Sequence, residues 1–163
     1  MHIQPSFKET RDDVLHALIQ RHPLATVVVH TDELVDNHFP LFLSAGGKHG
    51  VLQGHIPKSN PLWQNLDAHP EQGLAAVAIF HGPQAYVTPS WYPSKAEHGK
   101  VVPTWNYAVV HAQGQAVAVH DSDWLFEHIN KLTNQQEASQ DLPWKVSDAP
   151  PDYSARLVDS LVG

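Results

Sequence analysis

The sequence predicts a mainly β, α+β protein built on a small antiparallel barrel, and three observations lead to this prediction. About six or seven short apolar stretches follow one another, separated by turn residues. The regular strand–helix alternation that a parallel sheet needs is missing. Helical patterns are confined to residues 8–22, a short insertion at 58–66, and the region 121–163. A closed or split antiparallel barrel with peripheral helices fits this order best.

The first sixty-six residues contain two helical patterns and three strands. Thr10 is a candidate cap for the helix over 8–22, which ends before Pro23 because a residue preceding proline avoids the helical region. The short helix within 58–66 begins with Asn60 as its cap and Pro61 at its first position. The strands are expected at Leu24–His30, His38–Leu43 and Gly50–Ile56, the last two as a hairpin around Gly46 and Gly47.

The second half contains four further strands and two helices. A turn at 81–83 separates a strand at Leu74–Phe80 from one at Gln84–Thr88, and Gly114 separates Thr104–Gln113 from Gln115–His120. A helix capped by Asp121 or Ser122 follows, with an apolar face that includes Trp124, Leu125, His128, Ile129 and Leu132. After a loop at Asn134–Ala149, a last helix is expected over 151–162 with Gly163 in a C-terminal cap position.

Composition indicates one domain with part of its surface buried between subunits. The 163 residues fit a single domain, 1–163, whose helical C-terminal part covers about 121–163. Charged residues make up 17% of the chain, below the roughly 25% of a typical soluble domain. Together with five Trp, this low charge density is typical of a protein with a subunit interface.

Charge and cysteine content exclude several classes of protein. The net charge is −7 and the ten Lys and Arg form no basic run, which argues against direct DNA binding by this chain alone and leaves binding through a partner. Without cysteine, there are no disulfides, thiolate metal sites or Cys nucleophiles. The first residues lack a signal-peptide pattern, and Leu74–Phe80 is too short to span a membrane, so a cytoplasmic location is expected.

The thirteen His raise the question of a metal or haem site. No HxH or HExxH spacing is present, and no Cys accompanies the His, so we predict no dedicated metal site. Haem binding through a His stays open as a minor alternative. The Rossmann, P-loop and nucleophile-elbow motifs are also absent, which disfavours those three enzyme classes.

The segment Tyr86–Tyr107 is the strongest candidate for ligand binding. Its proline-broken part, Pro89–Pro103, is a long loop, and long ordered loops are usually functional. Aromatic rings beside hydroxyl, amide and ammonium donors suit a ligand with a planar ring and an anionic tail. The alternative is a lid or dimer-contact loop whose Trp residues only pack. The candidate binding residues are Ser90, Trp91, Tyr92, Lys95, Thr104, Trp105 and Asn106.

A second segment, His55–Trp63, is a candidate anion site. A strand ends there and a capped helix begins, so that free backbone N–H groups lie close to the side chains of Lys58 and Ser59. For an isolated helix start, an ordinary surface turn is the commoner explanation. A phosphate-bearing ligand at the first segment would favour the anion site.

At these residues the sequence resembles the PaiB-like proteins, described as FMN-binding negative transcriptional regulators. The motifs HPLATVVVH, NHFPLFL, GHIPKSNPLW, SWYPSK and VPTWNY occur in the family's order, and the resemblance covers essentially the whole chain. It implies an FMN-binding split β-barrel of the pyridoxamine-phosphate-oxidase-like kind, a homodimer with flavin in clefts at the subunit interface. Family members usually continue past the last helix, so the chain is expected to be short relative to the family.

The resemblance also implies roles for the two segments. His55, Lys58, Ser59 and Asn60 stand where related barrels hold the FMN phosphate. The segment from Ser90 to Asn106 would line the flavin ring or close the cleft. No catalytic residue is identified. The implied function is a PaiB-type regulator, and the alternative is a flavin-dependent oxidoreductase acting on a small molecule, in which the cofactor supplies the redox chemistry.

Overall fold

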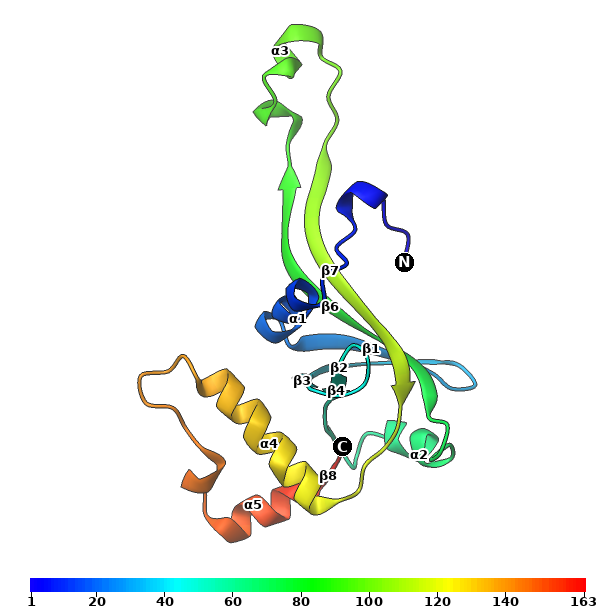
Figure 1. Cartoon of the computed structure of the whole chain (residues 1–163), viewed down its shortest axis with the longest axis vertical. Helices are drawn as coiled ribbons and strands as arrows, with labels where there is room; N and C mark the ends of the chain where they lie inside the picture. The colour runs from blue at the N-terminus through cyan, green and yellow to red at the C-terminus, as the bar shows by residue number, and fades with distance from the viewer.

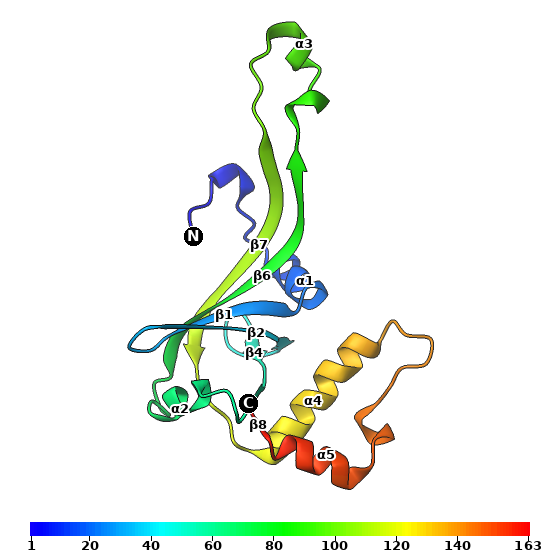
Figure 2. The same cartoon turned by 180° about the vertical axis from the view of Figure 1, so that it is seen from behind.

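The computed structural model describes residues 1–163, and its central feature is a four-stranded antiparallel sheet with a long projecting arm. The strand order is β2-β1-β6-β7, formed by β1 (Leu24–His30), β2 (Leu34–Pro40), β6 (Leu74–Val87) and β7 (Thr104–Ala116). In Figures 1 and 2, the paired ends of β6 and β7 leave the body of the molecule together and carry α3 at their tip. We call residues 84–107 the arm.

Two small antiparallel ladders and several helices surround this sheet. One ladder joins β3 (Phe42–Ser44) to β4 (Val51–Gln53), and the other joins β5 (Ile56–Pro57) to β8 (Leu161–Val162). The α-helices are α1 (Asp12–Arg21), α2 (Leu62–Asp67), α3 (Ser94–His98), α4 (Ser122–Glu137) and α5 (Pro151–Val158). Three 3-10 turns complete the chain: η1 (Pro5–Phe7), η2 (Pro89–Trp91) and η3 (Val146–Asp148). The predicted α+β class with antiparallel sheets and peripheral helices is confirmed.

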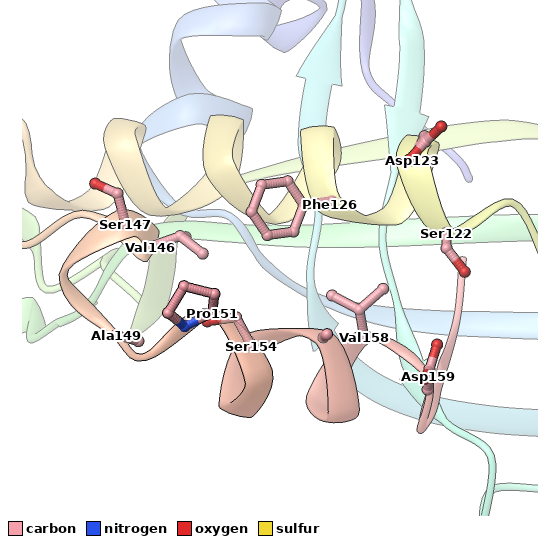
Figure 3. Close-up of a pocket in the computed structure, with 11 residues that line it drawn as sticks. Ser122, Asp123, Phe126, Val146, Ser147, Ala149, Pro151, Ser154, Val158 and Asp159 are labelled. Atoms are coloured by element: carbon pink, nitrogen blue, oxygen red, sulfur yellow. The ribbon is translucent and has the colours of Figure 1, made fainter.

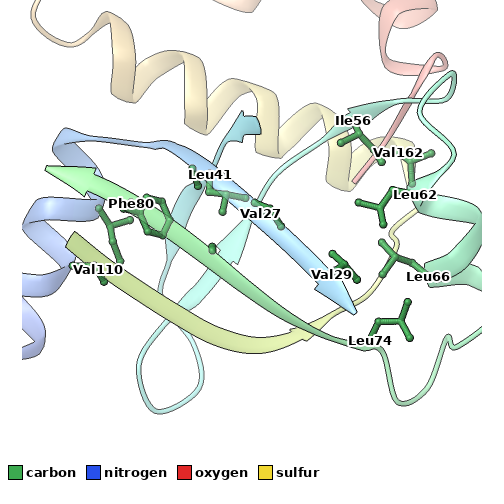
Figure 4. Close-up of a cluster of buried hydrophobic side chains, with 13 residues drawn as sticks. Val27, Val29, Leu41, Ile56, Leu62, Leu66, Leu74, Phe80, Val110 and Val162 are labelled. Atoms are coloured by element: carbon green, nitrogen blue, oxygen red, sulfur yellow. The ribbon is translucent and has the colours of Figure 1, made fainter. Parts of the chain in front are cut away.

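The hydrophobic core lies on one face of the four-stranded sheet (Figure 4). Ala25, Val27 and Val29 alternate along β1 and are all buried, as a strand with one covered face requires. Phe80 of β6 is completely buried among them, and Val110 of β7 lies opposite it. The other members of the cluster come from β6, α1, α2, the β5–β8 ladder and the link between β2 and β3: Leu74, Ala78, Ile19, Leu62, Leu66, Ile56, Val162 and Leu41.

The opposite face of the same sheet is covered much less well. We call it the outer face. Strand register and alternation place on it the apolar and aromatic residues Thr26, Val28, Val77, Ile79, Val109, Tyr107, Trp105 and Tyr86, interleaved with the polar His81, Gln84, His111 and Gln113. The members on the arm are the most open, with Tyr86, Trp105 and Tyr107 exposed by 49%, 58% and 69%. An isolated chain therefore leaves three aromatic rings of the arm, and the mixed apolar and polar surface beside them, uncovered.

The accessible surface of the whole chain is also larger than that of a compact monomer. It measures 11237 Å² for 18.1 kDa, and only 19 of 163 residues are buried. A compact monomer of this mass exposes about 8,100 Å². The difference is about 3,100 Å² of surface per chain beyond what a monomer of this size usually shows.

The C-terminal helices are joined to the body through main-chain pairing. β8 pairs with β5, and Gly163 exchanges two backbone hydrogen bonds with Val119, at 2.8 and 2.9 Å. A Cβ atom at Gly163 would overlap the indole ring of Trp124, so only glycine fits against this ring. None of the helices combines the length and apolar composition that crossing a bilayer requires.

Several predicted boundaries are wrong in the arm and the middle of the chain. His81–Pro83 is a β-bulge inside one continuous β6 strand and not a turn, because one extra residue is accommodated between the pairs His81–Val109 and Gln84–Tyr107. Gly114 does not divide two strands: β7 passes through it and ends at Ala116. The loop Pro89–Pro103 contains η2 and α3.

Helix boundaries also differ from prediction. α1 begins at Asp12 and has no side-chain cap, so Thr10 is not its cap; the carboxylate of Glu9 accepts the amides of Thr10 and Arg11, which precede the helix. α4 is capped by Asp121 as expected but continues to Glu137. The last helix ends at Val158, and the chain turns into β8, so Gly163 is paired with Val119 and is no helix cap.

Candidate functional site

The predicted site residues lie in two places that are far apart within one chain. His55, Lys58, Ser59 and Asn60 form the segment that leads into α2, beside the C-terminal strand β8. Ser90, Trp91, Tyr92 and Lys95 lie at the tip of the arm. Figure 1 shows α2 and α3 at opposite ends of the molecule. The structure therefore does not bring the two groups together within one subunit.

The segment before α2 is held by hydrogen bonds from its own predicted site residues. The Lys58 ammonium donates to the Asp159 carbonyl at 2.6 Å, and the Lys58 amide donates to the Ser160 carbonyl at 2.8 Å. Asn60 accepts a hydrogen bond from the Leu62 amide through Oδ1 at 3.0 Å, although Pro61, and not Asn60 as predicted, is the N-cap residue of α2. Lys58 and Asn60 thus position α2 against the end of α5.

Two further contacts tie this segment to the sheet and leave one side chain free. The Asn60 amide group donates to Oδ1 of Asn37, on β2, at 2.6 Å. The Trp63 indole donates to the Lys58 carbonyl at 3.0 Å. Ser59 is exposed and forms no hydrogen bond. Its hydroxyl is available to an outside ligand.

His55 contacts a buried histidine of α4. Nδ1 of His55 lies 3.1 Å from Nε2 of His128, and the two rings meet edge to face. His128 is 1% exposed and stacks on Trp124, while its other ring nitrogen, Nδ1, has no hydrogen-bond partner. Burial, together with the neighbouring charges of His55 and Lys131, lowers the pKa of His128 to about 4. Burial also lowers the pKa of His55.

The tip of the arm brings four predicted residues around one open hollow. Ser90, Trp91, Tyr92 and Lys95, with Pro93 and Ala96, line a cavity of about 490 Å³. The Lys95 ammonium donates to the Ser90 hydroxyl at 3.0 Å, and Thr88 caps the turn η2 through the Ser90 amide. Trp91 is 69% exposed. This hollow offers a flat aromatic surface and a cation.

The stem of the arm separates the remaining three predicted residues by strand alternation. Trp105 lies on the outer face, where its ring meets that of Tyr86 edge to face with centroids 6.0 Å apart. Thr104 and Asn106 point to the other side of the arm because neighbouring residues of a strand alternate. A single ligand on one face of the arm can contact either Trp105 or the Thr104 and Asn106 pair.

The sequence reasoning missed three residues that shape the segment before α2. His128 was placed on the inward face of its helix but not beside His55, although a histidine within an apolar stripe signals a buried polar contact. Asn37 and Asp159 carried no local signal, since they meet this segment only through the fold. No group of three or more His, Asp or Glu side chains is arranged to hold a metal ion.

Comparison with known proteins identifies the class and then the family. The fold is similar to that of the flavocytochrome Anf3 from Azotobacter vinelandii, with a TM-score of 0.65 and 15% identity, covering 99% of this chain and 66% of that one. This defines a mixed α+β fold of the kind found in flavoproteins. The sequence matches the family described as "Putative FMN-binding domain" over residues 1–163. The chain belongs to this FMN-binding family, and FMN is its cofactor.

Relatives from bacteria and fungi extend this assignment. Protease synthase and sporulation protein PAI 2 of Bacillus subtilis is 30% identical over 164 residues, which cover all of this chain and 74% of that protein. An uncharacterized protein of Emericella nidulans is 33% identical over 196 residues, which cover all of this chain and 78% of that protein. The resemblance to PaiB-like proteins is confirmed.

The residues of the two groups fit FMN chemically, each for a different part of the molecule. Lys58 and Ser59 offer an ammonium and a free hydroxyl, as a phosphate requires. Trp91 and Tyr92 offer flat, open apolar surface for an isoalloxazine ring, and Lys95 offers a donor beside it.

Proposed function

We propose that this protein is an FMN-binding homodimer of split-barrel type, in which each flavin cleft is built from both subunits. The observation that supports this proposal most strongly is the arm, which carries an aromatic face and most of the predicted site residues away from the body. FMN supplies one- and two-electron redox chemistry when it is bound. The protein's contribution is to hold and orient it.

The excess of exposed surface is large enough for a homodimer interface, which supports a second copy of this chain as the partner. Each chain exposes about 3,100 Å² more than a compact monomer of its mass. A standard interface buries about 800 Å² per partner, and obligate homodimers bury 2,000–5,000 Å² or more in total. Exposed aromatics such as Tyr86, Trp105 and Tyr107 are the residue types that anchor such interfaces. The outer face is therefore proposed as the dimer surface.

The separation of the two groups supports a cleft shared between subunits. In the arm, β6 and β7 pair from Gln84–Tyr107 to Val87–Thr104, so this part of the arm cannot fold back to the segment before α2 without breaking the pairing. A tip that reaches the partner's body brings Trp91, Tyr92 and Lys95 of one subunit toward Lys58 and Ser59 of the other. We propose that the arm closes the flavin cleft in this way.

Within this cleft, we assign the phosphate to Lys58 and Ser59 and the ring to the arm. His55 and Asn60 act as positioning residues, because the first contacts α4 and the second bonds to the Leu62 amide at the start of α2 and to Asn37 of β2. Trp91, Tyr92 and Trp105 supply the flat surface, and Ser90 and Lys95 supply polar contacts. Thr104 and Asn106 line the arm's other side.

The cofactor and the phosphate site are tested by comparing FMN with riboflavin. The purified protein is expected to sediment as a dimer and to quench the fluorescence of added FMN. Lys58→Ala and Ser59→Asp should each weaken FMN binding by about 10- to 100-fold, since a charge-assisted contact contributes about 1.5–3 kcal/mol, and should leave riboflavin binding unchanged. Lys48→Ala, an exposed lysine elsewhere on the body, is the matched control.

The outcomes separate the two parts of this proposal. A colourless dimer that does not bind FMN contradicts flavin binding by this chain. Ser59 has no structural hydrogen bond to lose. If Ser59→Asp lowers the affinities for FMN and for riboflavin equally, the phosphate binds elsewhere.

A mixed dimer tests whether the cleft is shared. Lys58→Ala and Lys95→Ala homodimers each lack one contact in both clefts. In a heterodimer of the two variants, a shared cleft gives one wild-type site and one site with both losses, so half of the sites should regain wild-type affinity. If each cleft is built within one subunit, no wild-type site can form. Lys100→Ala in place of Lys95→Ala is the control at the arm tip.

We further propose that the flavin-loaded dimer acts as a PaiB-type negative regulator through a partner. The support is the similarity to PAI 2 of Bacillus subtilis, whose name refers to protease synthesis and sporulation. A net charge of −7 opposes direct contact with DNA phosphates. Mobility-shift assays with purified protein at low salt should therefore give no sequence-selective complex. A tight selective complex formed by the protein alone would contradict the need for a partner.

A further inference from the structure

The outer face carries two histidines on its longest strands, just below the arm. His81 of β6 lies opposite Val109, and His111 of β7 lies opposite Ile79, so the two histidines are diagonal neighbours on this face. Diagonal neighbours of this kind are about 7–8 Å apart, which is within reach of long side chains. His111 is half-buried and His81 is exposed. We call these two residues the histidine pair.

No carboxylate of the chain balances a proton on the histidine pair. The groups whose charges act on His111 are the Met1 amino group and His81, and both are positive. Burial, together with these two charges, lowers the pKa of His111. Neither ring of the pair forms an ion pair. A proton on either ring therefore stays uncompensated on this face.

The other histidines on this side of the sheet have a carboxylate beside them. Asp36 of β2 pairs with Val28 and shares its side of the sheet. His38 lies two residues further along β2, and His30 of β1 is the diagonal neighbour of Asp36. Asp36 can thus balance a proton on either of them. With the histidine pair and the tyrosines of the arm, these three residues are the titratable groups that the four strands place on this side.

Much of the negative charge of the chain lies on the C-terminal helices instead. Eight of the seventeen Asp and Glu residues belong to residues 121–163. Figure 3 shows two of them, Asp123 and Asp159, at the hollow between α4 and α5. α4 packs against β3, η3 and α5, and no carboxylate of these helices is among the charges that act on His111. The histidine pair is therefore a positive spot, when protonated, on an acidic protein.

We propose that the histidine pair makes assembly of the dimer depend on pH, so that acid separates the subunits and opens the shared flavin clefts. This inference rests on the proposed dimer, whose interface is the outer face. A ring that the partner covers loses the water that hydrates its charge. In a two-fold dimer, the partner also brings the same pair to the interface. Neutral rings can be covered, whereas protonated rings oppose assembly.

The direction and size of the effect follow from proton linkage. Below the pKa of these rings, the free chain binds protons that the dimer excludes, so the dimer is stable at higher pH and weakens as the pH falls. Each excluded proton raises the dissociation constant about tenfold one pH unit below that pKa, and two rings per dimer give about 100-fold. Since the pKa of His111 is already below its ordinary value of 6.5 in the single chain, dissociation is expected below pH 6.5.

The test measures the dimer dissociation constant of the purified full chain, with FMN added, by sedimentation velocity over a dilution series at pH 7.5, 6.5 and 5.5. The wild-type constant should rise at least about 10-fold between pH 7.5 and 5.5. His81→Gln/His111→Gln should remain dimeric, with a change of less than about 3-fold. His30→Gln/His38→Gln, the two histidines beside Asp36, is the matched control and should keep the wild-type dependence. Circular dichroism at each pH verifies that the separated subunits stay folded.

A second variant keeps the inference testable if the double variant is poorly folded. His81→Lys places a permanent positive charge at an exposed position and should weaken the dimer at least about 10-fold at pH 7.5, whereas His81→Gln should not. A wild-type dimer that is equally tight at pH 7.5 and 5.5, a double variant that weakens like the wild type, or a His81→Lys dimer of wild-type strength would overturn this inference and leave the dimer standing. A monomer at pH 7.5 would overturn the proposed dimer as well.

Discussion

The pair His55–His128 predicts how the stability of this protein depends on pH. His128 is buried against Trp124 and its ring contacts His55 at 3.1 Å, so it is held in the neutral form. Its pKa is about 4 in the folded protein against an ordinary value of 6.5. Between these values, the unfolded chain binds a proton that the folded protein does not. The stabilisation is complete above pH 6.5 and is lost as the pH falls toward 4.

The magnitude follows from this shift. The free energy of unfolding should fall by at most about 1.4 kcal/mol per pH unit through this interval, for a total of about 2–3 kcal/mol at pH 4. The pKa of His55 is lowered by burial as well, so it acts in the same direction. His128→Leu removes the titrating group and costs about 1–2 kcal/mol at pH 7.5, where the contact with His55 is lost. Near pH 4.5, the variant should equal or exceed the wild type in stability.

Urea denaturation followed by circular dichroism at pH 7.5, 6.5, 5.5 and 4.5 measures this difference at a fixed protein concentration. His30→Leu, a substitution of an exposed histidine at the end of β1, is the control and should keep the wild-type dependence on pH. If His128→Leu loses stability between pH 6.5 and 4.5 as steeply as the wild type, another group carries the effect and the reasoning about this pair is wrong.

Three further substitutions test the packing of the core and of the C-terminal helices. Phe80→Ala should lower the free energy of unfolding by about 3–5 kcal/mol in the same assay, because Phe80 is fully buried; a loss under 1 kcal/mol would contradict its place in the core. Gly163→Ala forces a Cβ atom into the ring of Trp124, and hydrogen exchange in α4 should accelerate, whereas unchanged protection would argue against this contact. Asp121→Ala removes the cap of α4 and should cost about 1 kcal/mol, measured by thermal unfolding, with Asp123→Ala as the non-capping comparison.

The sequence predicts most elements of this fold because their signals are local. The β-branched run of β1 and the Asp121 cap are both found where expected. Gly82 and Pro83 were misread because the same two residue types mark turns and β-bulges, and only the partner strand decides between them. Gly163 was misread as a helix cap for a similar reason: its partner, Val119, lies 44 residues away in the chain.

The same difference between local and distant contacts decides which parts of the candidate site could be predicted. The hollow at the arm tip, with Trp91 and Lys95, could be predicted because its residues are close in sequence. The contact of His55 with His128 could not, since 73 residues separate them and helix periodicity gives the direction of a side chain but not its neighbour. The sequence also could not predict whether the site residues before α2 meet those at the arm tip, because the arm holds the two groups far apart within one chain.

The arm has a consequence for how the protein acquires its structure in the cell. A newly made chain presents Tyr86, Trp105 and Tyr107 on a hairpin that its own body does not cover. If a second chain covers them, the last step of folding is an encounter between two molecules, and its rate rises with protein concentration. At low concentration the open hairpin persists, and exposed apolar strands of this kind are prone to aggregate. Dilute refolding should therefore be slow and concentrated refolding prone to precipitation, with the best yield at an intermediate concentration.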